Sequence, residues 1–131
     1  MVTLALCLWH TGISQAEITN CKDVEDSITG SKWEHAADSV PAMTIVLEPN
    51  GKLRFVGGFK YWNPAHWSYD KDLCELHIIA KKFQKSDFTL FADDVSRGYL
   101  KRIDPKNQTI IFAVDGTTKY IVLGKYFYYK Q

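Results

Sequence analysis

Turn signals recur about every ten residues from Ser31 to the end of the chain, and short runs rich in β-branched and aromatic residues separate them. The clearest signals are Pro49-Asn50-Gly51, Asp104-Pro105-Lys106-Asn107 and Asp115-Gly116. Proline presets φ for a turn, and Asn-Gly and Asp-Gly accept the positive φ of two-residue hairpins. Runs joined in this way pair antiparallel with their neighbours, so the spacing predicts an all-β fold.

The runs between the turns define the expected strands. A helical pattern is confined to Lys22–Thr29 and predicts one short helical turn near the N-terminus. A meander of strands loses its exposed edges when it closes on itself. We therefore expect an up-and-down antiparallel barrel of about eight to ten strands. The expected strands include Met43–Leu47, Lys52–Phe59, Trp67–Tyr69, Cys74–Ala80, Asp87–Phe91, Arg97–Ile103, Gln108–Val114, Thr117–Leu123 and Lys125–Lys130.

Length and charge narrow the class of protein. A chain of 131 residues with 46% hydrophobic residues supports one packed domain. The formal net charge is +1, and the basic residues are scattered among the acids. A nucleic-acid partner is therefore not expected, because phosphate backbones are bound by concentrated basic surfaces.

The first sixteen residues contain no Asp, Glu, Lys or Arg. Val2–Trp9 is apolar, and Ser14-Gln15-Ala16 places small residues where signal peptidase prefers them. We interpret residues 1–16 as a signal peptide and residues 17–131 as a single barrel domain, secreted or periplasmic. The alternative is a buried first strand or helix. Eight apolar residues are too few to span a bilayer, so no membrane span is expected.

Removal of such a leader takes Cys7 away and leaves Cys21 and Cys74. An even pair in an oxidising compartment is expected to form a disulfide. The alternative is two unrelated buried thiols. No Cys-x-x-Cys or Cys/His spacing indicates a metal or another cofactor.

Residues 59–70 read FKYWNPAHWSYD and are dense in aromatic residues. Pro64 interrupts a strand ladder, because it donates no hydrogen bond and restricts Asn63 to extended geometry. Phe59–Tyr61 and Trp67–Tyr69 are therefore expected as separate strand pieces, with a loop between them. We assign Trp67 and Tyr69, with Trp33, to the core. We expect Tyr61, Trp62 and His66 to form an exposed functional edge.

The order of features resembles the lipocalin-like (calycin) domains of small exported proteins. A short helical turn comes first, then Gly30-Ser31-Lys32-Trp33, and then a meander that contains Pro49-Asn50-Gly51 and Trp67-Ser68-Tyr69-Asp70. The resemblance covers Gly30 to Lys130. It implies a β-barrel that opens with Trp33 on its first strand.

Catalytic patterns are missing from the sequence. It has no Gly-x-Ser-x-Gly elbow and no glycine-rich phosphate loop. The histidines that follow the leader, His35, His66 and His77, lack metal-ligand spacing. The acid pairs Asp70/Asp72 and Asp93/Asp94 fall in predicted turns, where carboxylates cap backbone amides. We expect neither enzymatic activity nor a metal.

Two functions remain after these exclusions. In one, the barrel holds a small apolar molecule that enters beside Tyr61–Trp67. In the other, the barrel is filled, and the protein acts as an exported inhibitor or immunity-type protein through a protein–protein surface around Tyr61–His66. The sequence leaves this choice open, because about eight to ten strands enclose either a ligand or a packed interior.

Overall fold

A computed structural model gives the structure of the protein and describes residues 21–35, 44–116 and 120–131. The expected signal peptide lies outside these residues. In chain order, with 3₁₀ helices written η, the elements are η1 (Cys21–Asp23), α2 (Val24–Ile28), β1 (Ser31–His35), β2 (Thr44–Leu47), β3 (Lys52–Val56), η2 (Gly57–Trp62), β4 (Ala65–Asp70), β5 (Glu75–Ala80), α3 (Lys85–Ser96), β6 (Arg102–Asp104), η3 (Pro105–Asn107), β7 (Thr109–Gly116), β8 (Tyr120–Leu123) and β9 (Tyr126–Lys130).

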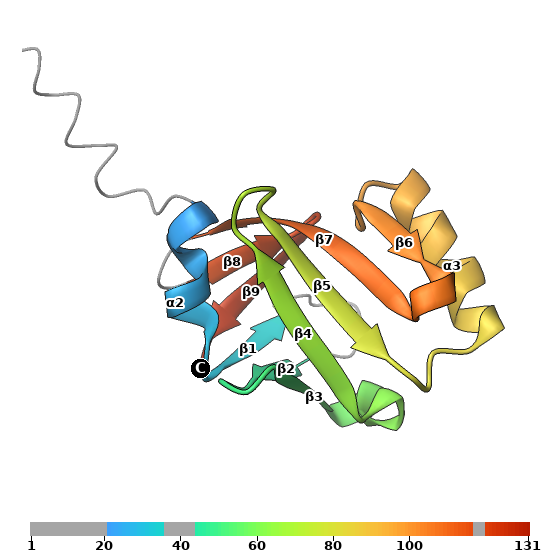
Figure 1. Cartoon of the computed structure of the whole chain (residues 1–131), viewed down its shortest axis with the longest axis horizontal. Coiled ribbons are helices and arrows are strands. Elements are labelled where there is room, and N and C mark those ends of the chain that lie inside the picture. Colours follow the sequence, from blue (N-terminus) through green and yellow to red (C-terminus); the bar gives the residue numbers. More distant parts are fainter. Residues whose placement is uncertain (1–20, 36–43, 117–119) are drawn as a thin grey trace, which may run out of the picture.

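Within the described residues, eight strands close into an antiparallel barrel in the order β1-β2-β3-β4-β5-β7-β8-β9 (Figure 1). β9 returns to β1, where Trp33 lies opposite Lys130, and this pairing closes the ring. β6 lies outside the ring and pairs with the first half of β7, along the edge that β8 occupies further on. The predicted barrel is confirmed, with the meander interrupted by α3 and β6 between β5 and β7.

Alternate residues of the barrel strands point into the core. Ile45 and Leu47 of β2 are buried, and so are Leu53 and Phe55 of β3, as their parity predicts. Trp33 of β1 is fully buried, which confirms its assignment to the core. Its indole Nε1 has no hydrogen-bond acceptor among the described residues.

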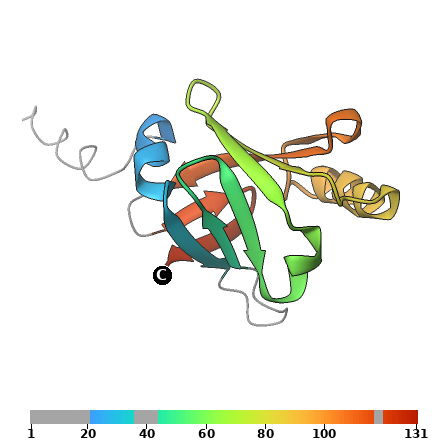
Figure 2. The same cartoon turned by 60° about the horizontal axis from the view of Figure 1, so that its bottom comes forward.

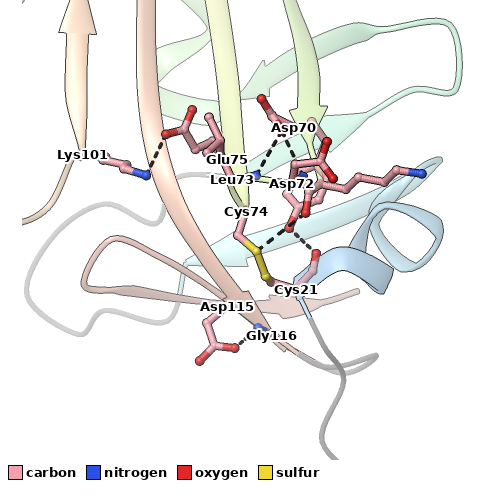
Figure 3. Close-up of a disulfide and its surroundings, with 11 residues drawn as sticks. Cys21, Asp70, Asp72, Leu73, Cys74, Glu75, Lys101, Asp115 and Gly116 are labelled. Carbon is pink, nitrogen blue, oxygen red and sulfur yellow. Dashed lines mark hydrogen bonds and ion pairs between the residues drawn. A yellow bond between two sulfur atoms is a disulfide. The ribbon is translucent and has the colours of Figure 1, made fainter.

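The predicted helical turn is confirmed as η1 and α2, which lie on the side of the barrel away from α3 (Figure 1 and Figure 2). Val24 and Ile28 are fully buried and pack α2 into the core. Cys21 and Cys74 form a disulfide with their Cα atoms 5.6 Å apart, as predicted (Figure 3). The disulfide therefore joins η1 to the residue that precedes β5.

The expected strand Asp87–Phe91 is wrong, because these residues lie in helix α3. The backbone N–H of Gln84 donates to Asp87 Oδ2 at 2.7 Å, an interaction that caps the start of the helix. Phe88 and Phe91 lie three residues apart, so they share one helical face, and both are buried in the core.

Several strands begin or end at other residues than the sequence predicts. β3 ends at Val56 rather than Phe59, because Gly57 takes a positive φ of 82° and begins η2. Of Arg97–Ile103, only the last two residues join a strand, β6. β7 runs through Asp115-Gly116, so the chain reverses later than the sequence predicts.

Candidate functional site

The predicted edge of Tyr61, Trp62 and His66 spans the end of η2 and the start of β4. The chain passes between these elements through Asn63-Pro64, whose peptide bond is cis. Tyr61 is 58% exposed and His66 is exposed, as expected. The break at the proline is confirmed, but Phe59–Tyr61 belongs to a 3₁₀ helix rather than to a strand.

Trp62 is only 8% exposed, so the prediction that it points into solvent is wrong. Its Nε1 donates to Asp87 Oδ2 at 3.2 Å, the carboxylate that also caps α3. Its ring packs at centroid distances of 5.0–5.7 Å against Phe55, Phe59, Phe83 and Phe91. Helix α3 therefore contributes Phe91 and the acceptor Asp87 to the surroundings of this tryptophan, and Phe83 precedes the helix by two residues.

Trp67 and Tyr69 of β4 were assigned to the core. Trp67 is buried, and its Nε1 donates to the backbone carbonyl of Glu48 at 3.0 Å. Tyr69 is partly buried against the core, and its hydroxyl donates to the backbone carbonyl of Cys21. Burial, assisted by the charge of Glu25, raises the pKa of Tyr69 to about 12. Trp67 therefore belongs to the core, whereas Tyr69 lies at its edge.

The ladder between β3 and β4 is short. It holds the pairs Lys52–His66 and Leu53–Ala65. Beyond them, the side-chain amide of Asn63 takes the place of a strand partner for Phe55. Asn63 Oδ1 accepts from Phe55 N at 2.8 Å, and Asn63 Nδ2 donates to Phe55 O at 2.8 Å. The backbone of β3 thus keeps its hydrogen bonds while the two strands separate.

A depression of about 300 Å³ lies on the outer surface where β3 and β4 separate. Most of the surface exposed in it is apolar, although five of its eight lining residues are polar or charged. The lining residues are Glu48, Lys52, Leu53, Arg54, Asn63, Pro64, Ala65 and His66. The depression therefore adjoins the segment that was predicted to be functional.

Cations outnumber acids around this depression. Glu48, the only acid among the lining residues, holds Arg54 Nε at 3.3 Å. Lys52 and His66 lie directly opposite each other across the ladder. Within the described part of the chain, neither side chain has a hydrogen bond or an ion pair. The depression is thus bordered by donors that lack an acceptor.

A second charged cluster lies on the outside of the barrel around Glu75, which is 1% exposed. Its carboxylate accepts from Arg102 Nη1 at 2.5 Å and Nη2 at 3.0 Å. It also accepts from Lys101 Nζ at 2.7 Å (Figure 3). His77 Nε2 lies 2.9 Å from Glu75 Oε1. Arg102 reaches Glu75 across β7. Ile111, which lies opposite Arg102 in the β6–β7 ladder, is buried.

These bonds lower the pKa of Glu75 to about 2, and the hydrogen bond from Arg102 is the largest cause. A carboxylate held ionised with its oxygens occupied is suited to structure rather than to acid–base catalysis. The cluster joins the outer strand β6 to β5. Glu75 and His77 lie two residues apart on β5 and so share one face, but no local pattern connects them to Arg102, since β6 lies outside the ring.

The remaining sequence candidates form no reactive group. Asp70 caps the β4–β5 turn by accepting from Asp72 N at 3.0 Å, as predicted. Asp93 and Asp94 lie on α3 rather than in a turn, and Asp93 pairs with Arg97 at 3.0 Å.

The structure also tests for metal ligands and for membrane-spanning helices. Among residues 21–35, 44–116 and 120–131, no three His, Cys, Asp or Glu side chains are placed to hold a metal. The side chain of His35 lies outside the described residues. In the same part of the chain, no helix has the length and hydropathy to cross a bilayer.

Comparisons with models of known families, with curated proteins and with solved structures gave no significant match.

Proposed function

We propose that this chain is an exported, non-enzymatic binding protein that recognises a protein partner through the surface around Tyr61–His66. One observation carries the proposal: Tyr61 is exposed while its neighbour Trp62 is buried. The two rings are in contact, with centroids 5.3 Å apart. An exposed tyrosine next to a fixed tryptophan is a preorganised contact for a partner.

The energetics of interfaces support this choice of residue. Tyrosine is enriched among the residues that contribute most to binding, because it gives a large contact area at a low cost in conformational entropy. The aromatic contacts and the bond to Asp87 hold Trp62. The backbone that presents Tyr61 is therefore ordered before a partner binds.

The burial of Trp62 also helps to choose between the two predicted functions, ligand binding in the barrel and partner binding at the surface. An apolar ligand was expected to enter beside Tyr61–Trp67, and the indole of Trp62 fills space there together with Phe83 and Phe91. The surface function needs no such entrance. The geometry therefore favours the inhibitor or immunity-type alternative.

A ligand inside the barrel remains a second candidate, and one observation favours it. Trp33 Nε1 is a fully buried donor without an acceptor among the described residues. Buried donors are normally satisfied, so an acceptor on a ligand or an internal water is the expected partner. Native mass spectrometry of protein purified from its own source tests this candidate, because a retained ligand adds mass.

We include export and a relationship to the calycins in the proposal. The disulfide between Cys21 and Cys74 supports an oxidising compartment, secreted or periplasmic. The closed eight-stranded ring of described strands, with Trp33 buried on β1, supports the calycin relationship. Intact mass of the exported protein tests the leader: the mature chain is expected to begin at Glu17.

The partner surface is tested with two variants of exposed residues. Immobilised wild type, Tyr61→Ala and Leu90→Ala are compared for capture from the exported fraction of the source. Leu90 is the matched control, because it is 65% exposed on α3. We expect a stoichiometric partner with wild type and Leu90→Ala, and binding weakened at least about tenfold by Tyr61→Ala, equivalent to about 1.4 kcal/mol. Equal capture by all three proteins would contradict the proposal.

A further inference from the structure

The depression lies two residues along the chain from Tyr61, at residues 63–66, and Glu48 is the one acid among its lining residues. Lys52 and Arg54 point from the same face of β3, since they lie two residues apart. His66 faces Lys52 from β4. Glu48 is engaged with Arg54. An anionic group placed between Lys52 and His66 would therefore gain charge-assisted hydrogen bonds that no described side chain provides.

The size and lining of the depression limit what this anion is attached to. A volume of about 300 Å³ is at the lower end for small-molecule sites and has room for an acidic side chain together with part of the segment that carries it. Pro64, which is exposed, provides apolar contact for the methylene groups of such a side chain. A nucleic-acid backbone does not fit, because its repeated phosphates require an extended basic surface and Glu48 lies in the lining.

We propose that the depression receives an Asp or Glu side chain of the protein partner, with Lys52 and His66 donating to its carboxylate. The inference rests on the proposed function and adds the chemistry of the partner: an acidic segment that reaches the depression while an adjacent part contacts Tyr61. By contrast, the cations of the Glu75 cluster already have an acid, so an acidic segment gains less there.

Two blocked pentapeptides test the chemistry without the natural partner. The sequences Gly-Leu-Glu-Leu-Gly and Gly-Leu-Gln-Leu-Gly differ only in the charge of the central side chain. Each is titrated into ¹⁵N-labelled protein, and the amide shifts of Leu53, Ala65 and His66 are followed. We expect the Glu peptide to bind at least about fivefold more tightly than the Gln peptide, a difference of about 1 kcal/mol.

Two variants locate the effect. Lys52→Gln is expected to remove the preference for the Glu peptide. Lys71→Gln is the matched control and is expected to keep it, because Lys71 is exposed in the turn at the far end of β4. Sodium acetate distinguishes a free anion from a peptide side chain. Equal affinity for both peptides, a preference that survives Lys52→Gln, or acetate binding as tight as the Glu peptide would overturn the inference.

The two proposals fail separately. Loss of the Glu preference, with partner capture still dependent on Tyr61, removes the acidic segment and leaves the binding surface. A Glu preference that depends on Lys52, with no partner dependent on Tyr61, shows a carboxylate site and removes the proposed function.

Discussion

The outer surface of the barrel carries two groups of basic side chains that differ in the acid available to them. In the Glu75 cluster, Lys101, Arg102 and His77 all contact one buried carboxylate. At the depression, Lys52 and His66 contact no acid in the described part of the chain. The first group therefore contributes ion pairs to the fold, and we propose that the second group contacts a partner.

The two regions also differ in what orders them. Aromatic packing beneath Tyr61 holds the region of the depression, through Trp62 and its contacts with Phe83 and Phe91. Ion pairs hold the other region, through Glu75. Substitutions at Trp62 and Glu75 therefore test different physical forces, and each has a matched control that is expected to matter little.

The largest expected effect is that of Trp62→Ala. Because this ring is buried among phenylalanines, its removal should lower the free energy of unfolding by about 3–5 kcal/mol. Tyr61→Ala, at the adjacent exposed position, should change it by less than about 0.5 kcal/mol. Urea unfolding of both variants, with the disulfide intact, measures the difference. Similar losses for the two variants would mean that Tyr61 is part of the core.

The next largest effect is expected at Glu75. Glu75→Gln removes the charge that Arg102 and Lys101 contact, and we expect a loss of about 2–4 kcal/mol. Glu48→Gln is the matched control, because its pair with Arg54 is exposed and is worth less than about 1 kcal/mol. Urea unfolding at neutral pH compares the two variants. A loss at Glu48 as large as that at Glu75 would remove the contrast between the regions.

The pH dependence of stability separates the charge of Glu75 from its packing. Its pKa is lowered from an ordinary value of 4.5 to about 2 in the folded protein, so its stabilisation is complete above about pH 4.5 and is lost as pH falls through 2. Wild type should therefore lose more stability than Glu75→Gln between these values. Unfolding midpoints of both proteins from about pH 6 to about pH 2 measure the effect, and parallel curves would contradict it.

The barrel was predictable from the sequence because strand alternation and turn chemistry are local signals. Leu53 and Phe55 point inward by parity, and Pro49-Asn50-Gly51 reverses the chain before them. The disulfide between Cys21 and Cys74 was predictable by elimination. These inferences needed no knowledge of which distant segments meet.

The two main errors concern helix α3 and Trp62, which contact each other in the structure. Helix α3 was read as a strand, although Phe88, Phe91 and Val95 have helical spacing and Asp87 follows Gln84 at capping-box distance. Leu90 is apolar but exposed on the other face of the helix, so it obscures this helical spacing in the sequence. The prediction that Trp62 is exposed came from the strand break at Pro64, and it missed that the distant Phe83 and Phe91 pack against this ring. Its burial is a long-range contact that local patterns do not contain.

The smallest expected effect compares one lysine from each basic group. Lys101 lies 2.7 Å from the buried acid Glu75, so Lys101→Gln should lower the free energy of unfolding by about 1 kcal/mol. Lys52 makes no contact with an acid in the described part of the chain, so Lys52→Gln should change it by less than about 0.3 kcal/mol. Both variants remove one positive charge, which makes the change in net charge the same. Binding of the Glu peptide should respond in the opposite order, lost in Lys52→Gln and kept in Lys101→Gln. A lysine that can be removed without loss of stability but not without loss of binding is expected at a recognition site, since stability alone does not retain it.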